Sequence, residues 1–128
     1  MSSPPMITII DDDESVRIAT ESLVRSLGFS ARTFASAEDF LNSTLVGETA
    51  CVITDVQMPG MSGVELQSHL RSKGDATPLI FITAFPEERI RRQVDAAGAV
   101  GFLAKPFDGH AMVECIDRAL GERDTADA

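Results

Sequence analysis

The sequence predicts an α/β fold in which five βα units build a doubly wound, five-stranded parallel sheet. Apolar runs of strand length alternate along the chain with segments of helical period, which is typical of βα units around a parallel sheet. Three of the runs, MITII, ACVIT and PLIFIT, consist almost entirely of apolar or β-branched residues. Strands of this kind are expected where helices cover both faces of a sheet.

Five segments are expected to form the strands. Their ranges are Ile7–Asp11, Ser30–Phe34, Cys51–Asp55, Leu79–Thr83 and Gly101–Ala104. The second segment differs from the others because SARTFA alternates with polar residues, which indicates an edge strand.

Five segments with helical period complete the βα units. Their ranges are Glu14–Leu27, Ala37–Leu45, Ser62–Lys73, Glu87–Ala97 and Gly109–Leu120. A glycine follows each of them within a residue or two, and glycine most easily takes the left-handed conformation that closes a helix. These glycines are Gly28, Gly47, Gly74, Gly98 and Gly121. Ser62 and Glu65 form a capping-box pattern, and Ser36 and Asp108 are candidate N-caps.

The length and composition indicate one globular domain. A chain of 128 residues with 44% hydrophobic residues can bury a core without disulfides or metals. We expect the domain to cover residues 6–120, with an N-terminal tail at 1–5 and a C-terminal tail or the start of a linker at 121–128. Cys51 lies in an apolar strand-like run and Cys115 in a predicted helix, both without metal-binding spacing, which indicates buried thiols in a reducing compartment.

The charge balance argues against several kinds of partner. With 20 acidic and 11 basic residues the formal net charge is -9, and contacts with nucleic-acid or lipid phosphates need a face rich in Lys and Arg. No apolar run approaches the roughly 18 residues of a membrane span, and the first residues lack the pattern of a secretory signal. We therefore expect a soluble, cytoplasmic protein that binds neither nucleic acid nor membranes directly.

Chemically active side chains follow four of the five predicted strands. Asp11 and Asp12 end the first strand, Asp55 the third, Thr83 the fourth, and Lys105 follows the fifth. In an open parallel sheet, ligands bind at the carboxyl ends of the strands. The sequence thus predicts a site that combines carboxylates, a hydroxyl and an ammonium group at one edge of the sheet.

The carboxylates favour a hard divalent cation. Ionised carboxylates within about 4 Å of each other repel by several kcal/mol in a cleft, and a cation relieves this repulsion. The cluster offers oxygen ligands without His or Cys, so Mg²⁺ fits best, with Mn²⁺ as an alternative. A cation, an ammonium and a hydroxyl can together hold the oxygens of a phosphoryl group while a carboxylate attacks it. The predicted chemistry is phosphoryl transfer to an aspartate.

The motifs at the strand ends resemble those of the receiver domains of bacterial two-component response regulators. The matching segments are IIDDDESVR, VITDVQMPGMSGVEL, FITAF and GFLAKPF, and the resemblance covers residues 6–120. The sequences of these segments are most similar to those of the nitrogen-fixation regulator (FixJ-like) group. The resemblance implies a flavodoxin-like (βα)5 fold with strand order 2-1-3-4-5, and a signalling domain rather than an enzyme.

The resemblance also implies a role for each site residue. Asp55 would accept the phosphoryl group from a sensor histidine kinase, and Thr83 and Lys105 would bind its oxygens. The metal ligands would be Asp11, Asp12, Asp55 and the backbone carbonyl of Gln57. Thr83, Phe102 and Pro106 would form the switch, with Pro106 following a cis bond. The output face would be the fourth helix, fifth strand and fifth helix, which would mediate a phosphorylation-dependent homodimer and transcriptional regulation through an attached or partner domain.

Two positions near the site are expected to set the phosphorylation lifetime. Gln57 lies two residues after Asp55 and Phe85 two residues after Thr83, where side chains can admit or exclude the hydrolytic water. Phe85 has no group that could orient this water. The expectation is slow loss of phosphate, on the order of minutes or longer.

Several other polar residues have simpler explanations. Asp13 directly precedes the first helix, where an N-cap is a commoner role than a metal ligand. His69 and His110 have no acidic partner at useful spacing and are interpreted as structural or surface residues. The arginines of the fourth helix are slightly better explained by a solvated face than by a dedicated contact. They are Arg89, Arg91 and Arg92.

Two alternative functions are weighed against the receiver. One is a phosphatase of the haloacid dehalogenase type, because Asp11, Asp13 and Ser15 resemble the first motif of that family. Its motif order is different, since those enzymes carry a further acidic pair after the lysine, whereas here Asp55 precedes it. The other is a receiver-like module that acts without phosphorylation, which is ranked low because every acceptor-site residue is present.

Overall fold

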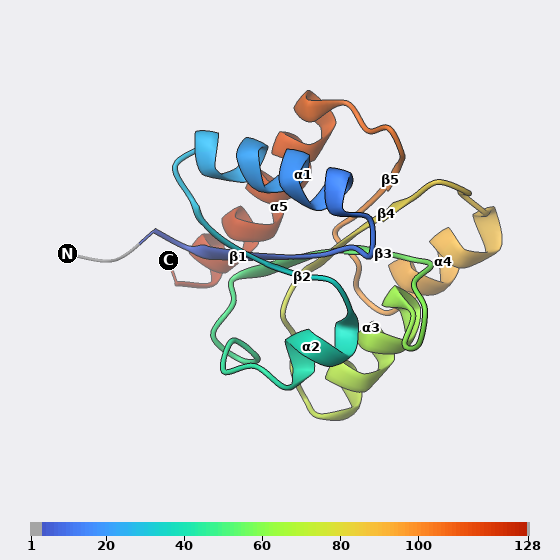
Figure 1. Cartoon of the computed structure of the whole chain (residues 1–128). Coiled ribbons are helices and arrows are strands. Elements are labelled where there is room, and N and C mark those ends of the chain that lie inside the picture. The colour runs from blue at the N-terminus through green and yellow to red at the C-terminus, as the bar shows by residue number, and fades with distance from the viewer. Residues whose placement is uncertain (1–3, 128) are drawn as a thin grey trace.

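The computed structural model describes residues 4–127, the last six by their backbone. Five parallel strands form one sheet in the order β2-β1-β3-β4-β5 (Figure 1). They are β1 (Met6–Ile10), β2 (Ser30–Phe34), β3 (Cys51–Asp55), β4 (Leu79–Thr83) and β5 (Gly101–Ala104). The predicted parallel sheet, its strand order and the edge position of β2 are confirmed.

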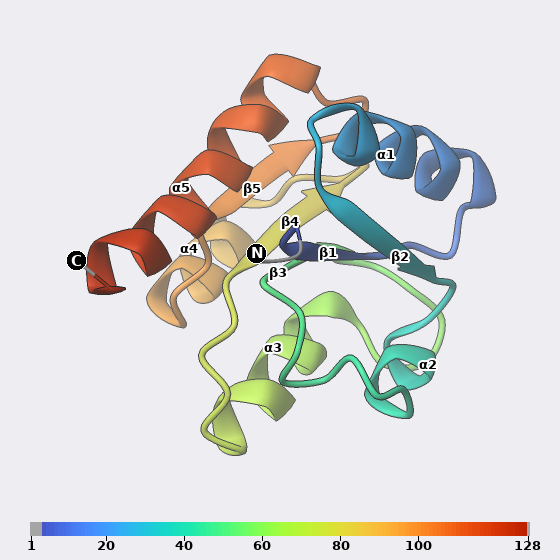
Figure 2. The ribbon, with the colours of Figure 1, turned by 90° about the vertical axis from the view of Figure 1, so that its left-hand side faces the viewer.

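Helices cover both faces of the sheet (Figure 2). They are α1 (Glu14–Ser26), α2 (Ala37–Leu41), α3 (Gly63–Ser72), α4 (Glu88–Ala96) and α5 (Gly109–Asp127). α1 and α5 lie on one face, and α2, α3 and α4 lie on the other. Because both faces are covered, β3 and β4 are buried along their whole length, which explains their continuous apolar sequence.

Alternate strand residues point to two separate cores. Ile53 and Ile82 pack toward α1 and α5 with Met112 and Ile116 of α5. Their strand neighbours point the other way, where Phe81 packs with residues of α2, α3 and α4. Both predicted thiols, Cys51 and Cys115, are buried in the first core. No helix among residues 4–127 is long and apolar enough to cross a membrane.

The predicted helix starts are confirmed by their caps. The Ser36 hydroxyl accepts a hydrogen bond from the Asp39 amide at 3.1 Å, and Ser62 and Glu65 form the complete capping box. The Asp108 carboxylate accepts a bond from the His110 amide at 3.0 Å. The glycines predicted to follow the first four helices have positive φ angles, a conformation that side chains with a Cβ disfavour.

The first strand and the ends of two helices differ from their predictions. β1 begins at Met6 and ends at Ile10, one residue earlier than predicted at each end, so Asp11 follows the strand, although its amide still donates to the Phe34 carbonyl at 3.2 Å. α2 ends at Leu41 rather than Leu45, because the Ser43 hydroxyl donates to the Phe40 carbonyl at 2.6 Å and so competes with the helical ladder.

The end of the fifth helix differs most from its prediction. α5 continues through Gly121 and across most of the predicted tail at 121–128, as far as Asp127. Glycine permits a helix to stop but does not require it, since a helical glycine costs only about 1 kcal/mol relative to alanine. The other helices begin or end within one residue of the predicted positions.

Candidate functional site

The predicted site residues meet at the carboxyl edge of the sheet. Asp55 is the last residue of β3 and Thr83 the last of β4, while Asp11 follows β1 and Lys105 follows β5. The parallel register pairs Ile10 with Thr54 and Thr83 with Ala104, which brings the four strand ends to one level. The order of the strands therefore joins residues that lie up to 94 positions apart, from 11 to 105.

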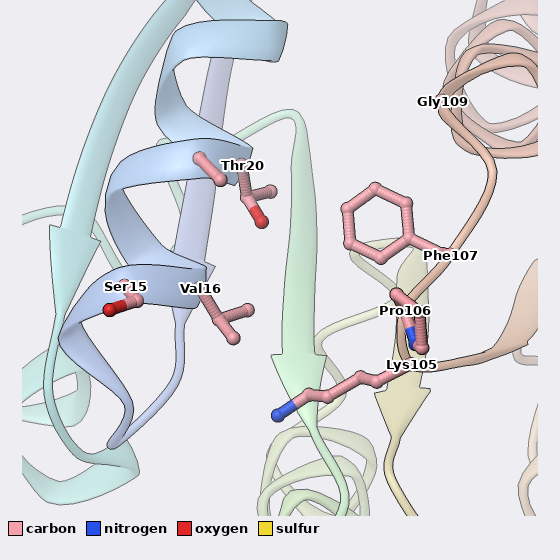
Figure 3. Close-up of a pocket in the computed structure, with 8 residues that line it drawn as sticks. Ser15, Val16, Thr20, Lys105, Pro106, Phe107 and Gly109 are labelled. Carbon is pink, nitrogen blue, oxygen red and sulfur yellow. The ribbon is translucent and has the colours of Figure 1, made fainter.

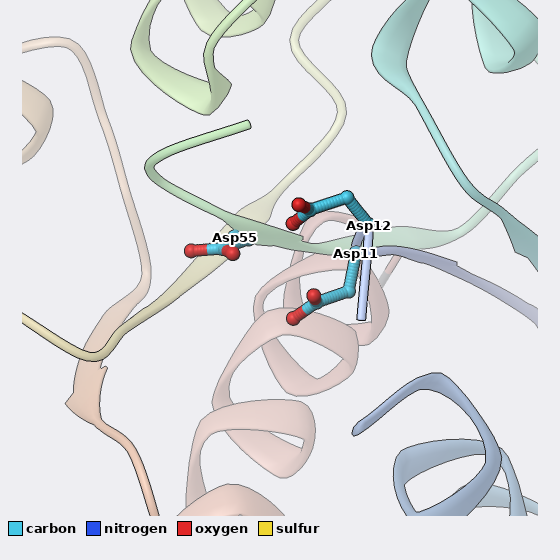
Figure 4. A group of neighbouring side chains, drawn as sticks. All are labelled: Asp11, Asp12 and Asp55. Atoms are coloured by element: carbon cyan, nitrogen blue, oxygen red, sulfur yellow. The ribbon is translucent and has the colours of Figure 1, made fainter. Parts of the chain in front are cut away.

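Three aspartates form one acidic cluster (Figure 4). Asp11, Asp12 and Asp55 each offer a carboxylate oxygen, and these oxygens lie within 4.8 Å of one another. Asp11 and Asp55 are buried, whereas Asp12 is exposed. The cluster thus has two carboxylates inside the fold and one that faces solvent.

Asp13 is a helix cap, as the sequence favoured. Its carboxylate accepts hydrogen bonds from the Ser15 amide at 2.9 Å and the Val16 amide at 3.3 Å. Its own amide donates to Asp11 Oδ1 at 2.8 Å. The start of α1 is therefore fixed to the acidic cluster, and this bond sets the orientation of the Asp11 carboxylate.

Lys105 lies between the two buried carboxylates and pairs with both. Its Nζ lies 2.8 Å from Asp11 Oδ2 and 3.0 Å from Asp55 Oδ2. The bond to Asp55 is well directed, whereas the contact with Asp11 is an ion pair without a well-aligned hydrogen bond. The peptide bond between Lys105 and Pro106 is cis. Lys105 thus occupies the side of the cluster nearest β5.

The ionisation of Asp55 and Lys105 follows from this arrangement. Burial raises the pKa of Asp55, and the negative charge of Asp11 adds to the rise, while the hydrogen bond from Lys105 opposes it. Burial alone would lower the pKa of Lys105, but its interactions with the negative charges of Asp11 and Asp55 outweigh this and raise it. The charged form of Lys105 is therefore stabilised, whereas the ionised form of Asp55 is made less favourable by burial and by the charge of Asp11.

The cluster has the donors that a hard cation requires. Three carboxylates converge within 4.8 Å, and two of them are buried with only one ammonium group between them. A divalent cation would balance the remaining negative charge, and carboxylate oxygens are the ligands that Mg²⁺ prefers. The Gln57 amide donates to Asp55 Oδ1 at 3.3 Å, so the loop after β3 also adjoins the cluster. The residues present fit such an ion.

Thr83 and Phe102 of the predicted switch lie at β4 and β5, and Phe85, a predicted lifetime position, follows β4. The Thr83 side chain is buried, and its hydroxyl accepts a hydrogen bond from the Phe85 amide at 3.1 Å. Phe102 is half-buried against the core below α4. Phe85 is 68% exposed, so any shielding of Asp55 by its ring requires a change in the loop after β4.

Two polar contacts at the site were not predicted from the sequence. Arg17 donates to the Asp11 carbonyl at 2.7 Å, and Glu38 accepts from the Met61 amide at 2.9 Å. Arg17 lies in the segment IIDDDESVR, so its nearness to the cluster had a local signal. Glu38 had none, because it lies on another element, 23 residues from Met61.

A cavity of about 330 Å³ lies beside the site, between α1 and residues 105–109. Val16 and Thr20 of α1 face Pro106 and Phe107 across it, and Lys105 lines the end nearest the cluster (Figure 3). The walls are mostly apolar. The Thr20 hydroxyl is buried and has no hydrogen-bond partner among the described residues.

Together the fold and the acidic edge define a class of protein, the receiver domain of two-component response regulators. Residues 7–117 match the family model of the response regulator receiver domain, and the chain belongs to this family. This assignment favours the signalling interpretation over the phosphatase alternative. It also confirms the resemblance that the strand-end motifs indicated.

Relatives and solved structures agree with the assignment. The chain is 41% identical to the response regulator protein TodT of Pseudomonas putida over 115 residues, which are 90% of this chain and 51% of TodT. It is 34% identical to the transcriptional regulatory protein FixJ of Azorhizobium caulinodans, over 90% of this chain and 54% of FixJ.

The structure of the response regulator StyR superimposes with a TM-score of 0.87 at 38% identity, over 98% of this chain and 65% of StyR. The chain spans about half the length of the curated relatives that it matches.

Proposed function

We propose that this receiver is a cytoplasmic, phosphorylation-operated switch in which Asp55 accepts a phosphoryl group from a phosphohistidine of a sensor histidine kinase. The observation that carries the proposal is the position of Lys105, which lies 3.0 Å from Asp55 and 2.8 Å from Asp11 at the carboxyl edge of the sheet. An aspartate between a lysine and further carboxylates is equipped to bind a phosphoryl group and a cation together.

In the proposed reaction, a carboxylate oxygen of Asp55 attacks phosphorus. The new O–P bond forms as the P–N bond of phosphohistidine breaks, and the released imidazole takes a proton from solvent. The Lys105 ammonium exchanges its bond to Asp55 for one to a phosphoryl oxygen. Thr83 donates its hydroxyl to a second phosphoryl oxygen.

Asp11, Asp12, Asp55 and the backbone carbonyl of Gln57 are the proposed ligands of Mg²⁺, with Mn²⁺ as an alternative. The ion supplies positive charge that offsets the charge of the transferred phosphoryl group. Asp12 is the exposed member of the cluster, whereas Asp11 and Asp55 are buried. Asp11 is oriented by the Asp13 amide, which donates to its Oδ1 at 2.8 Å.

The proposed output begins at Thr83. The Thr83 hydroxyl can donate its proton to a phosphoryl oxygen while it still accepts from the Phe85 amide, so its movement toward the phosphoryl group draws the loop after β4 inward. Phe102 then turns inward beside it, and the face formed by α4, β5 and α5 changes shape. We propose that this face forms a homodimer after phosphorylation, and that it controls transcription through an attached or partner output domain, as the names of relatives such as FixJ suggest.

The cavity beside Lys105 is the proposed place where the kinase makes contact. The donor histidine must come within bonding distance of Asp55, and the apolar walls next to Lys105 offer it a surface that excludes water. Ala19 of α1 also lines this cavity and is exposed. Ala19→Arg should reduce transfer from a phosphorylated histidine kinase by about tenfold or more and leave labelling by acetyl phosphate unchanged. Equal effects on both donors would contradict this placement.

Chemical phosphorylation tests the central proposal. The protein is incubated with acetyl phosphate and Mg²⁺, and its intact mass is measured. We expect a gain of about 80 Da that is absent from Asp55→Asn and from samples in EDTA. A wild-type protein that gains no mass at any Mg²⁺ concentration would support the phosphorylation-independent module instead.

A further inference from the structure

The loop that follows the phosphoacceptor is anchored at its base. It runs from Val56 to the N-cap of α3 at Ser62 and carries Gln57. The Val56 amide donates to the Ile82 carbonyl at 3.0 Å, and the Val56 carbonyl accepts from the Gly63 amide at 2.9 Å. Met58 is buried in the core below α3. These contacts fix the two ends of the loop and Met58, but they do not hold the loop at Gly60 and Met61.

Glu38 of α2 holds the outer part of this loop. Its Oε2 accepts a hydrogen bond from the Met61 amide at 2.9 Å. The preceding residue, Gly60, has a φ angle of 76° and lies so close that an added Cβ would come within 2.5 Å of the same oxygen. The Glu38 carboxylate is therefore in direct contact with the backbone at Gly60 and Met61. The bond from Met61 also lowers the pKa of Glu38, which agrees with an ionised acceptor.

We propose that Glu38 is a positioning residue for the phosphorylation site, which acts by holding the loop so that the Gln57 carbonyl stays in place as a metal ligand. The inference rests on the proposed function, since Gln57 and the metal belong to it. The loop reaches the site at Gln57, whose amide donates to Asp55, and reaches Glu38 at Met61. Between them lie Met58, Pro59 and Gly60, so Glu38 and Met58 together determine the path of this short segment.

This arrangement predicts a specific defect. Without the Glu38 carboxylate, the Met61 amide loses its partner and the loop samples more conformations, so the Gln57 carbonyl is less often available to the ion. Residues that orient metal ligands commonly change metal affinity by about tenfold or more when they are removed. The nucleophile, Lys105 and Thr83 are held by other contacts. Metal affinity should therefore fall, while the reaction at saturating metal is preserved.

The test compares Glu38→Ala and Glu38→Gln with the wild-type chain. The Gln amide oxygen can still accept the bond from Met61, so it should restore what Ala removes. Asp39→Ala is the matched control, because Asp39 is the next residue, lies in the same turn of α2 and carries the same charge. Thermal unfolding of each variant checks that the fold is retained.

Two measurements use no phosphoryl donor. In an NMR titration with Mg²⁺, Glu38→Ala should raise the dissociation constant by about tenfold, and Glu38→Gln and Asp39→Ala by less than about twofold. Amide hydrogen exchange at Met61 should become faster in Glu38→Ala alone. Faster exchange with an unchanged Mg²⁺ dissociation constant would overturn the proposal, because the contact would then have no effect on the metal.

Labelling with acetyl phosphate separates this proposal from the function on which it rests. In Glu38→Ala, the Mg²⁺ concentration for half-maximal labelling should rise by about tenfold, with a maximal rate within about twofold of wild type. If wild type and Glu38→Ala are both labelled and need the same Mg²⁺ concentration for half-maximal labelling, only the proposed role of Glu38 is overturned. A wild type that binds Mg²⁺ but is never labelled would instead overturn phosphorylation at Asp55.

Discussion

The Nζ atom of Lys105 lies 3.0 Å from Oδ2 of Asp55, so the proposed phosphoacceptor is already paired with a cation before any phosphoryl group arrives. The same ammonium group lies 2.8 Å from Asp11. It balances one of the two buried negative charges, and the second remains for a metal ion to balance. This incomplete neutralisation links stability, pH and metal binding at the site.

Replacing Asp55 by Asn should stabilise the fold at neutral pH. Burial raises the pKa of Asp55 in the folded protein above 3.8. Its favourable contribution to the free energy of unfolding is therefore complete below pH 3.8 and is lost as the pH rises through the pKa of the folded state. Asn does not titrate and avoids this loss. In EDTA we expect Asp55→Asn to melt a few degrees above wild type at pH 7, with a difference that shrinks as the pH is lowered toward 3.8.

Far-UV circular dichroism is the suitable probe, because the chain contains neither Trp nor Tyr. Mg²⁺ should reduce the difference in melting temperature at pH 7, since it binds the wild-type cluster more tightly than the Asp55→Asn cluster and so stabilises the wild type more. A lower melting temperature for Asp55→Asn at pH 7 in EDTA would show that the pair with Lys105 outweighs the cost of burying Asp55.

Removing the Lys105 charge should have the opposite effect. Lys105→Met leaves Asp11 and Asp55 buried with no ammonium between them, and breaking a buried pair in this way typically costs about 3–5 kcal/mol. We expect a loss of this order in the free energy of unfolding in EDTA, with partial recovery in Mg²⁺. Lys73→Met, at an exposed position after α3, is the control and should change little. If Lys105→Met lost the same free energy of unfolding in Mg²⁺ as in EDTA, the loss would not arise from the missing charge of Lys105.

Two glycines at equivalent helix positions should differ sharply when replaced by Ala. A Cβ at Gly63, the first residue of α3, would lie 2.2 Å from the Asp55 carbonyl oxygen, whereas one at Gly109, the first residue of α5, meets nothing within 4 Å. Because the clash is with backbone, we expect Gly63→Ala to lower the free energy of unfolding by about 1–3 kcal/mol and Gly109→Ala to be neutral or stabilising. Urea denaturation measures both, and equal effects would contradict the close packing at Asp55.

The sequence predicted the parts of this molecule that depend on local chemistry. Continuous apolar runs identified β3 and β4, and the serine caps identified the starts of α2 and α3. The strand-end positions of Asp55 and Thr83 then followed from the general geometry of parallel sheets. These predictions needed no knowledge of which distant residues pack together.

What the sequence did not predict depends on competition or on contacts between distant residues. α2 ended early because the Ser43 hydroxyl competes for the Phe40 carbonyl, and α5 continued because Gly121 allows a helix as well as a turn. The contact between Glu38 and Met61 joins two elements whose distance is set only by the completed fold.

The last prediction concerns Thr83 and the proposed dimer. With beryllofluoride as a phosphoryl mimic, we expect the Thr83 hydroxyl to donate to the mimic and to draw the Phe85 loop with it, and this movement is what should change the face of α4 and β5. Light scattering should show a wild-type dimer and a Thr83→Ser dimer, because Ser keeps the hydroxyl, but a Thr83→Val monomer, because Val has nearly the same shape without it. A Thr83→Val protein that dimerises like wild type would show that the signal reaches this face by another route. A wild-type protein that stays monomeric with beryllofluoride bound would refute the dimer itself.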